Sequence, residues 1–256
     1  MKEAVSVSDG PRSVVGIDVG GTGIKGAPVN LGTGELTRER IRLLTPAPAT
    51  PDAVARTVAE VVDQLDAPGP LGLTMPSVLT GGVVRTAANI DQSWLGVDAV
   101  ELFGTATGRP VVVVNDADAA GIAEVRFGAG AGRQGVVLLV TLGTGIGSAL
   151  FVDGVLVPNT ELGHLHLHHG DAEDWAADSV RERDDLSWEE YAQRLERYLQ
   201  MVQQLFWPSL IIIGGGISKK SDRYLPLMRV DTEVVPATLL NNAGIVGAAM
   251  TAASIG

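Results

Sequence analysis

The stretch VGIDVGGTGIKGAPV, Val15 to Val29, decides the fold, because it sets a glycine-rich turn between two runs typical of β-strands. It contains the spacing G-x-G-x-x-G at Gly21, Gly23 and Gly26. In a dinucleotide-binding fold the same spacing opens a helix, whose N-terminus receives the pyrophosphate. Pro28 and the strand-like alternation around it predict a second strand here instead of a helix. The sequence therefore predicts a β-hairpin built on glycines and argues against NAD binding.

The same pattern returns in GVVLLVTLGTGIGSALFVDGVLV, residues 135–157. The tetrapeptide GTGI occurs at 21–24 and again at 143–146, each time between two strand-like runs. A third glycine cluster, Gly214 to Gly216 in IIIGGGIS, follows an apolar run near the C-terminus. A repeat at this distance predicts an α/β protein of two lobes with similar topology, each starting with a glycine-turn hairpin, and a cleft between them.

Glycine turns at strand ends are suited to binding phosphate, because glycine lets the backbone approach closely and its N–H groups can bind phosphate oxygens. Asp18 lies just before the first turn and Thr141 just before the second. A carboxylate cannot bind phosphate itself, but it can hold a hydrated magnesium ion that does. The alternative is that the glycines only close tight hairpins. Three such turns in one chain favour a phosphoryl chain held between the lobes.

Composition narrows the class of partner. The 256 residues include no cysteine, which excludes disulfides, thiolate catalysis and cysteine-ligated zinc and is typical of cytoplasmic proteins. The net charge of -11 argues against nucleic acid or an anionic membrane as a partner. No apolar run approaches the roughly 20 residues that span a bilayer, and MKEAVSVSDGPR lacks the apolar core of a signal peptide. We expect a cytoplasmic protein.

The spacing of apolar residues predicts the remaining elements. A helix is expected over 51–65, with Thr50 as N-cap and Pro51 at its first position. Another helix is expected around 98–108, and a buried strand over VVVVND is followed by a helix over 117–127. Ser187 and Glu190 form the capping box of a long helix that ends near 206.

Five motifs together resemble those of the ROK sugar kinases: IDVGGTGIKG, NDADAAGIAE, TLGTGIGSA, ELGHL and IIIGGGIS. The resemblance runs from Val14 to about Ala252 and is strongest to the polyphosphate glucokinase branch, which includes forms that also use ATP and mannose. It implies the two-lobed, actin-like (ribonuclease H-like) ATPase fold. It also implies a likeness in activity: transfer of a phosphoryl group from polyphosphate, and also from ATP, to the 6-hydroxyl of glucose, giving glucose 6-phosphate. Magnesium as cofactor and a homodimer are implied as well.

The resemblance assigns roles to residues at matching positions. Asp116 is implied to be the general base, and Asp18 the magnesium ligand. The implied sugar-binding residues are Asn89, Asn115, Asp116, Glu161, His164 and Glu173. The residues implied to bind phosphate or nucleotide are Asp18, Gly20, Gly21, Thr22, Gly23, Lys25, Thr141, Gly143, Thr144, Gly145, Gly214, Gly215, Gly216, Lys219 and Lys220.

The sequence departs from the wider family in three places. A cysteine-rich zinc segment commonly follows ELGH, whereas HLHHGDAEDWAADS has no cysteine here, so no structural zinc is expected. Gly147-Ser148-Ala149 replaces a glycine run, and Pro76-Ser77 replaces a frequent Pro-Gly. All four histidines lie in GHLHLHHG, and if this run were a strand, His164, His166 and His168 would share a face and could bind a metal.

The resemblance also predicts how the chain divides. Residues 1–12 are expected to form a disordered tail, 13–117 a first lobe completed by the C-terminal helix 243–254, and 118–242 a second lobe. Several alternatives stay open. Asp116 could only cap the helix that follows it, and Lys219, Lys220 and Arg223 could be a solvated loop end instead of an anion-binding rim.

Other functions are weighed against the glucokinase. An ATP-dependent kinase for mannose, fructose or an N-acetylhexosamine is the nearest alternative. A sugar-sensing module without activity would leave Asp18, Asp116 and the glycine turns without a purpose. A ROK repressor would need a DNA-binding segment before the first strand, where about 13 residues stand.

Overall fold

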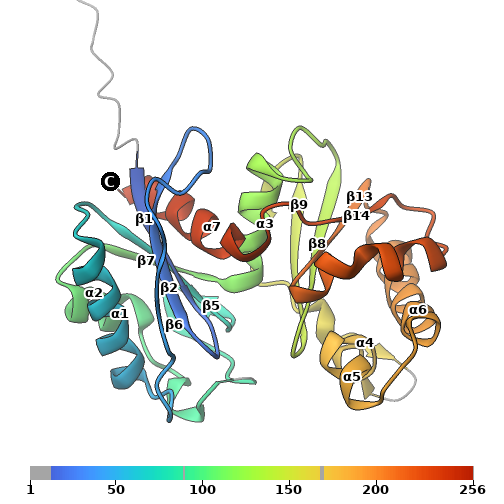
Figure 1. Cartoon of the computed structure of the whole chain (residues 1–256), viewed down its shortest axis with the longest axis horizontal. Helices are drawn as coiled ribbons and strands as arrows, with labels where there is room; N and C mark the ends of the chain where they lie inside the picture. The colour runs from blue at the N-terminus through green and yellow to red at the C-terminus, as the bar shows by residue number, and fades with distance from the viewer. Residues whose placement is uncertain (1–12, 89, 168–169, 256) are drawn as a thin grey trace, which may run out of the picture.

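A computed structural model describes residues 13–88, 90–167 and 170–255. The expected tail at 1–12 lies outside these residues. Two five-stranded sheets form the centres of two lobes, and helices α7 (Ala243–Ala252) and α3 (Asp116–Phe127) lie between them (Figure 1). The predicted two-lobed α/β fold is thereby confirmed. No helix among the described residues is long and apolar enough to cross a membrane.

The first sheet has the order β3-β2-β1-β4-β7. Strands β1 and β2 form the predicted hairpin around Gly21, and β1 pairs in parallel with β4, as β4 does with β7. Its strands are β1 (Ser13–Val19), β2 (Ile24–Asn30), β3 (Ile41–Leu43), β4 (Leu71–Met75) and β7 (Val111–Asn115). Helix α1 (Pro51–Leu65) coincides with its predicted range and buries an apolar face, and it packs on α2 (Ala99–Thr107).

The second sheet repeats this arrangement in the order β10-β9-β8-β13-β14. Its hairpin is β8–β9, and β8 pairs in parallel with β13, as β13 does with β14. Its strands are β8 (Val136–Leu142), β9 (Ile146–Val152), β10 (Val155–Val157), β13 (Leu210–Gly214) and β14 (Val234–Pro236). Both glycine turns therefore lie at the same position in equivalent sheets, which explains the internal repeat of the sequence.

Shorter elements border the two sheets. The small hairpins are β5 (Leu79–Thr80) with β6 (Val83–Val84), and β11 (His166–Leu167) with β12 (Gly170–Asp171). The remaining helices are α4 (Glu173–Ala176), α5 (Asp178–Arg183) and α6 (Trp188–Phe206). The 3₁₀ helices are η1 (Gln92–Trp94), η2 (Leu162–His164), η3 (Gly216–Arg223), η4 (Leu225–Leu227), η5 (Leu240–Asn242) and η6 (Ala253–Ile255).

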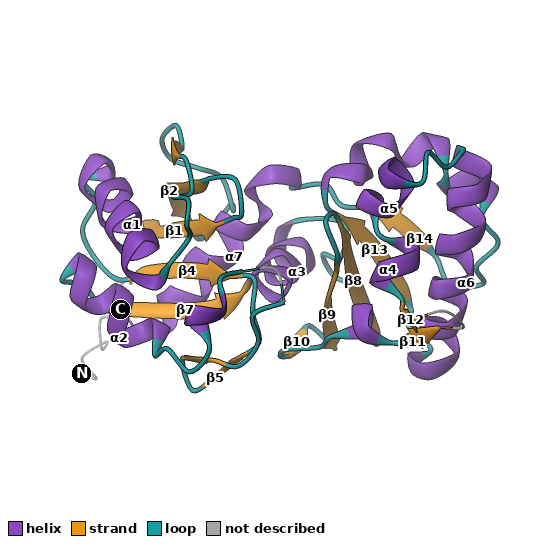
Figure 2. Cartoon of the chain, turned by 90° about the horizontal axis from the view of Figure 1, so that it is seen from below, coloured by secondary structure: helices purple, strands orange, loops and turns teal. Residues whose placement is uncertain are grey.

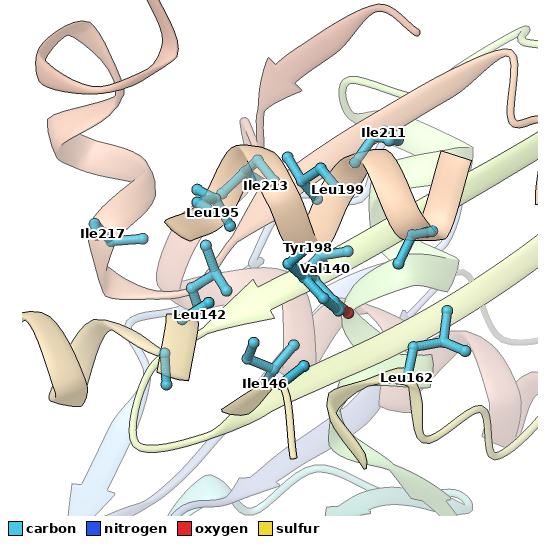
Figure 3. Close-up of a cluster of buried hydrophobic side chains, with 14 of the residues drawn as sticks. Val140, Leu142, Ile146, Leu162, Leu195, Tyr198, Leu199, Ile211, Ile213 and Ile217 are labelled. Carbon is cyan, nitrogen blue, oxygen red and sulfur yellow. The ribbon is translucent and has the colours of Figure 1, made fainter. Parts of the chain in front are cut away.

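The long helix α6 covers one face of the second sheet. Its predicted capping box is present, because Ser187 accepts from the Glu190 N–H while the Glu190 side chain accepts from the Ser187 N–H. Leu195, Tyr198 and Leu199 pack against strand residues such as Val140 and Ile211 (Figure 3). This core holds the second glycine turn, since β8 and β9 both enter it.

Helix α7 packs on the first sheet although it lies at the other end of the chain. A Cβ at Gly72 would stand 1.7 Å from the Ala248 carbonyl oxygen, and one at Gly16 would stand 1.9 Å from that of Ile245. Glycine on β1 and β4 thus lets the helix touch the sheet backbone. Gly247 on α7 makes the same close approach to the Ala119 carbonyl oxygen, at 1.8 Å, so α7 also joins α3.

Candidate active site

A cavity of about 420 Å³ lies between the two lobes. The first lobe lines it with Gly21 and with the loop residues Pro76, Ser77, Thr86 and Ala88. Of the residues predicted from sequence, the cavity brings together Gly21, Asn115, Asp116, Thr141, Gly143, Thr144, Gly145, Glu161, His164, Glu173 and Gly215. The other described ones lie outside its wall: Asp18, Gly20, Thr22, Gly23, Lys25, Gly214, Gly216, Lys219 and Lys220. Asn89 lies outside the described residues.

The first glycine turn leaves backbone N–H groups for a ligand. Its shape is held by the Gly20 N–H, which donates to the Gly23 carbonyl oxygen at 3.1 Å. The N–H groups of Gly21 and Thr22 make no hydrogen bond within the described part of the chain. Gly21 faces the cavity, so this turn can offer unpaired donors to an anion.

Asp18 is fixed just before that turn. The Thr74 hydroxyl donates to its Oδ1 at 3.0 Å, and the Lys25 ammonium lies 3.4 Å from its Oδ2. The side chain of Asp18 remains 21% exposed. A carboxylate placed in this way can hold a hydrated cation next to the phosphate turn.

The second glycine turn is anchored by α5. The Ser179 N–H donates to the Gly143 carbonyl oxygen at 3.0 Å, and its hydroxyl donates to that of Thr144 at 2.6 Å. These bonds fix the shape of the turn. The N–H groups of Thr144 and Gly145 have no acceptor among the described residues. The two turns thus present similar donor sets on the two lobes.

The third glycine cluster approaches the end of β8. Gly215 adopts φ 81° and ψ −179°, a conformation open to glycine alone, and a Cβ there would stand 2.2 Å from the Leu142 carbonyl oxygen. Gly216 faces open space, with no atom within 4 Å of an added Cβ. Of these two glycines, Gly215 is therefore the one that the fold requires and that lines the cavity.

Asp116 occupies the point where β7 passes into α3. The preceding residue caps the helix, since Asn115 Oδ1 accepts from the N–H groups of Ala117 and Asp118 at 2.8 and 3.0 Å. Asn115 Nδ2 donates to the Ser77 carbonyl oxygen at 3.1 Å. Asp116 Oδ1 accepts from the Ala117 N–H at 2.8 Å, and its Oδ2 makes no hydrogen bond with a described residue. Capping is mainly the task of Asn115, which leaves Asp116 Oδ2 available to a ligand.

The surroundings of Asp116 raise the pKa of its carboxyl group. Its side chain is exposed to the open cavity, and the protein around the cavity displaces part of the surrounding water. This desolvation raises the pKa of Asp116 to about 7, and the charges of Asp18 and Glu161 act in the same direction. The hydrogen bond from Ala117 opposes the shift. A carboxylate of this pKa suits proton transfer from a hydroxyl.

Four polar side chains gather at the other end of the cavity. His164 Nδ1 lies 2.9 Å from Asp171 Oδ2, and its Nε2 lies 3.7 Å from Glu161 Oε2. Glu173 Oε2 accepts from the Ile146 N–H at 3.2 Å, which ties it to the second turn. The bond to Asp171 is the main cause that raises the pKa of His164, and burial is the main cause that raises that of Glu161. Carboxylates and an imidazole in this arrangement can form hydrogen bonds with sugar hydroxyls.

Two residues that shape this end were missed in the sequence. Asp171 orients His164, although it stands in the same DAEDW stretch as Glu173. Ser148 was noted only as a departure from a glycine run. Its buried hydroxyl donates to the Thr160 carbonyl oxygen at 2.7 Å and accepts from the Leu162 N–H at 3.0 Å. It thereby holds the segment that carries Glu161.

The histidine run does not form one strand. His164 belongs to the 3₁₀ helix η2, and His166 belongs to β11, so the condition under which these histidines would share the face of one strand is not met at the start of the run. His168 and His169 lie outside the described residues. Among the residues that are described, no group of three or more His, Cys, Asp or Glu side chains could hold a metal ion.

Two of the basic residues considered as an anion-binding rim, Lys220 and Arg223, lie beside Trp188 together with Arg181. Arg223 and Lys220 lie 5.7 and 5.9 Å from the ring centroid of Trp188, and Arg181 of α5 lies at 4.6 Å. Arg181 is paired with Asp178 and Glu182, both at 3.2 Å. Lys220 and Arg223 form no ion pair with a described residue and are exposed. We call Arg181, Trp188, Lys220 and Arg223 the Trp188 cluster. Arg181 of this cluster belongs to α5, the helix whose Ser179 anchors the second turn.

Comparison with known proteins agrees with this geometry. The chain is 54% identical over 240 residues to a polyphosphate glucokinase of Mycobacterium tuberculosis strain CDC 1551, covering 93% of this chain and 91% of that protein. It superposes with a TM-score of 0.92 on the crystal structure of an inorganic polyphosphate/ATP-glucomannokinase from Arthrobacter sp. strain KM, at 55% identity, covering 95% of this chain and 99% of the other.

A more distant likeness bears on the fold alone. A ROK family glucokinase from Streptomyces griseus, solved in complex with glucose and AMPPNP, has a TM-score of 0.81 at 24% identity and covers 93% of this chain and 98% of its own. The model of the ROK family matches residues 14–176. The repeated hairpins, the two lobes and these matches lead to one conclusion: the chain belongs to the ROK family.

Proposed function

We propose that this protein is a glucokinase that transfers the terminal phosphoryl group of polyphosphate to the 6-hydroxyl of glucose, with ATP as a second donor. The observation that carries the proposal is the position of Asp116. It is a carboxylate with a pKa of about 7, in a cavity bounded by two glycine turns and by the Glu161–His164–Glu173 set. The names of the relatives point to the same reaction.

In the proposed reaction Asp116 accepts the proton of the 6-hydroxyl as that oxygen attacks the terminal phosphorus. A new P–O bond forms to the sugar, and the bond to the bridging oxygen of the donor breaks. The donor leaves one phosphate shorter, or as ADP. Phosphoryl transfer depends mainly on positioning and charge stabilisation, so the N–H groups of both turns would stabilise the transferred group.

Magnesium is part of the proposal, and the residues present fit it. Magnesium keeps several waters and takes one or two carboxylates together with substrate phosphates, and Asp18 offers a fixed, partly exposed carboxylate beside the first turn. When bound, the ion would neutralise charge on the donor phosphates. Lys25 already lies against Asp18 and would add a further positive charge at the same place.

The sugar would lie at the end of the cavity formed by Glu161, His164 and Glu173. Asn115 lines the same region, although its amide already caps α3 and bonds Ser77. Mannose as a second acceptor, the homodimer, the cytoplasmic location and the role of Asn89 stay predictions.

One assay separates this function from its nearest alternative. The purified protein is incubated with glucose, mannose, fructose or N-acetylglucosamine, each with ATP or polyphosphate, and the sugar phosphate is quantified. We expect glucose 6-phosphate from polyphosphate. Turnover with ATP and none with polyphosphate would leave an ATP-dependent hexokinase, and no product with any pair would reject the kinase.

A further inference from the structure

Asn159 connects the two lobes through a single side chain. It follows β10 in the second lobe, and its amide bonds both backbone groups of Leu79 in β5 of the first lobe. The Leu79 N–H donates to Asn159 Oδ1 at 3.0 Å, and Asn159 Nδ2 donates to the Leu79 carbonyl oxygen at 2.9 Å. Figure 2 shows β5 and β10 facing each other on one side of the space between the lobes.

Asp118 holds Asn159 in place for this contact. Asn159 has φ 58°, in the left-handed region that asparagine tolerates better than most residues. Its own N–H donates to Asp118 Oδ2 at 2.9 Å. Asp118 belongs to α3, directly beyond the Asn115 cap, and is 2% exposed. The crossing helix, the second lobe and the first lobe therefore meet at one asparagine.

The buried position of Asp118 is unfavourable for the stability of the folded protein. Its Oδ1 has no hydrogen-bond partner among the described residues, and burial raises its pKa to about 6. A buried carboxylate with one unpaired oxygen lowers stability. The one hydrogen bond that its carboxylate makes with a described residue is the one from the Asn159 N–H, so its position is explained more readily by what it orients than by a gain in stability.

The contact adjoins both walls of the sugar end of the cavity. On one side, Leu79 follows Pro76 and Ser77, which line the cavity together with Thr86. On the other side, Asn159 precedes Thr160 and Glu161, which line the opposite wall. A change in the Asn159–Leu79 contact would thus move one wall against the other.

We propose that Asn159, oriented by Asp118, pins the two lobes together at the sugar end of the cleft and keeps the two walls of the sugar site in register. Movement of the lobes then brings the phosphate turns together by rotation about this pin. Asp118 and Asn159 are positioning residues. The inference rests on the proposed function only in taking this end of the cavity as the sugar site.

The test uses Asn159→Gly, which tolerates a positive φ and keeps the N–H to Asp118 but deletes both bonds to Leu79. Asp118→Ala removes the other half of the pin, whereas Asp118→Asn keeps an oxygen for the Asn159 N–H and should rescue it. Asn30→Gly is the matched control, since Asn30 bonds the Gly32 N–H within one lobe.

Lobe geometry is measured first, without any substrate. The chain has no cysteine, so Glu101→Cys on α2 and Glu189→Cys on α6 give a clean pair of spin-label sites. We expect Asn159→Gly and Asp118→Ala to broaden the distance distribution, while Asp118→Asn and the control keep that of the parent. An unchanged distribution in Asn159→Gly would overturn the pin.

Glucose binding is measured next by calorimetry, without a donor. Loss of two hydrogen bonds that hold the walls should weaken glucose binding about tenfold in Asn159→Gly. A dissociation constant within twofold of the parent, despite a broadened distribution, would contradict the link to the sugar site. A parent protein that binds no glucose would contradict the proposed acceptor instead, and the spin-label distances would still decide the pin.

Discussion

The availability of the Asp116 carboxylate depends on the residue before it. Asn115 provides the helix cap, so the carboxylate of Asp116 keeps one oxygen without a hydrogen bond to a described residue. The same junction places it between the phosphate turns and the Glu161 set. The first residue of α3 is thus the position whose carboxylate the structure leaves open toward the cavity.

We predict that Asp116→Asn lowers kcat about 10²–10⁴-fold, because the amide keeps the shape and loses the basicity. Glucose binding should largely survive, since the polar set at Glu161 is untouched. Steady-state kinetics and calorimetry measure the two effects. Turnover close to that of the parent would show that another group accepts the proton.

The pH dependence follows from the pKa of about 7. The ionised carboxylate is the active form, so kcat/KM for glucose should fall below about pH 7, approaching tenfold per pH unit. Because folding raises this pKa, Asp116 favours the folded state at low pH, and this contribution is lost as the pH rises through 7.

Thermal unfolding tests the direction of this pH effect on stability. The melting temperature of Asp116→Asn relative to the parent should increase from pH 4 to pH 7 and then stay constant. A difference that does not change with pH would mean that folding does not perturb this carboxyl group.

At the scale of elements, the link from β13 to η3 depends on Gly215. We predict that Gly215→Ala lowers the free energy of unfolding by about 1–3 kcal/mol, because of its backbone conformation and the nearby Leu142 carbonyl. Gly216→Ala, which faces open space, should stay within about 0.5 kcal/mol of the parent. Denaturant unfolding of both variants measures this, and equal effects would contradict the close approach.

The Trp188 cluster joins α5, α6 and η3 into one basic surface. A long polyphosphate chain must leave the cavity over the surface of a protein with net charge -11, and Lys220 and Arg223 are cations without an ion-pair partner in the described chain. Lys219 is exposed in the same 3₁₀ helix. ATP is shorter and should need these side chains less.

We predict that Lys220→Ala/Arg223→Ala raises KM for long polyphosphate more than KM for ATP, and that its polyphosphate KM depends less on salt, because the lost interaction is electrostatic. Lys219→Ala/Lys220→Ala should act in the same direction. Arg38→Ala/Arg56→Ala, on the first lobe, is the control. Equal losses for both donors would indicate a structural role for η3.

At the scale of the whole molecule, α7 near the end of the chain packs against the elements that carry the cavity residues. It touches β1 and β4 on one side and α3, which begins with Asp116, on the other. The two lobes are therefore coupled, because α7 packs both on the first sheet and on α3 between the lobes (Figure 1).

We predict that Gly247→Ala destabilises the protein by about 1–3 kcal/mol and lowers kcat, because its Cβ would meet the Ala119 carbonyl oxygen at 1.8 Å and push α3. Gly104→Ala in α2 is the matched control. Its Cβ would make only an ordinary contact at 3.6 Å, so it should raise stability by up to about 1 kcal/mol through helix propensity. A neutral Gly247→Ala would mean that α7 shifts freely.

Much of the fold could be predicted from the sequence because it follows from local patterns. The hairpins around Gly21 and Gly143 follow from alternation and glycine, and α1 and the Ser187–Glu190 cap follow from periodicity and capping chemistry. The repeat of GTGI indicated two equivalent sheets, which the strand orders confirm. Such features depend on residues a few positions apart.

Other features only the tertiary structure decided, because they depend on groups distant in the chain. The pKa of Asp116 arises from water displaced by both lobes and from Asp18 and Glu161, which no local pattern encodes. The bonds of Asn159 to Leu79 join residues 80 positions apart, and the cations around Trp188 come from two elements, α5 and η3. The sequence by itself determined which strands and turns form, whereas packing determined which side chains meet in the cleft.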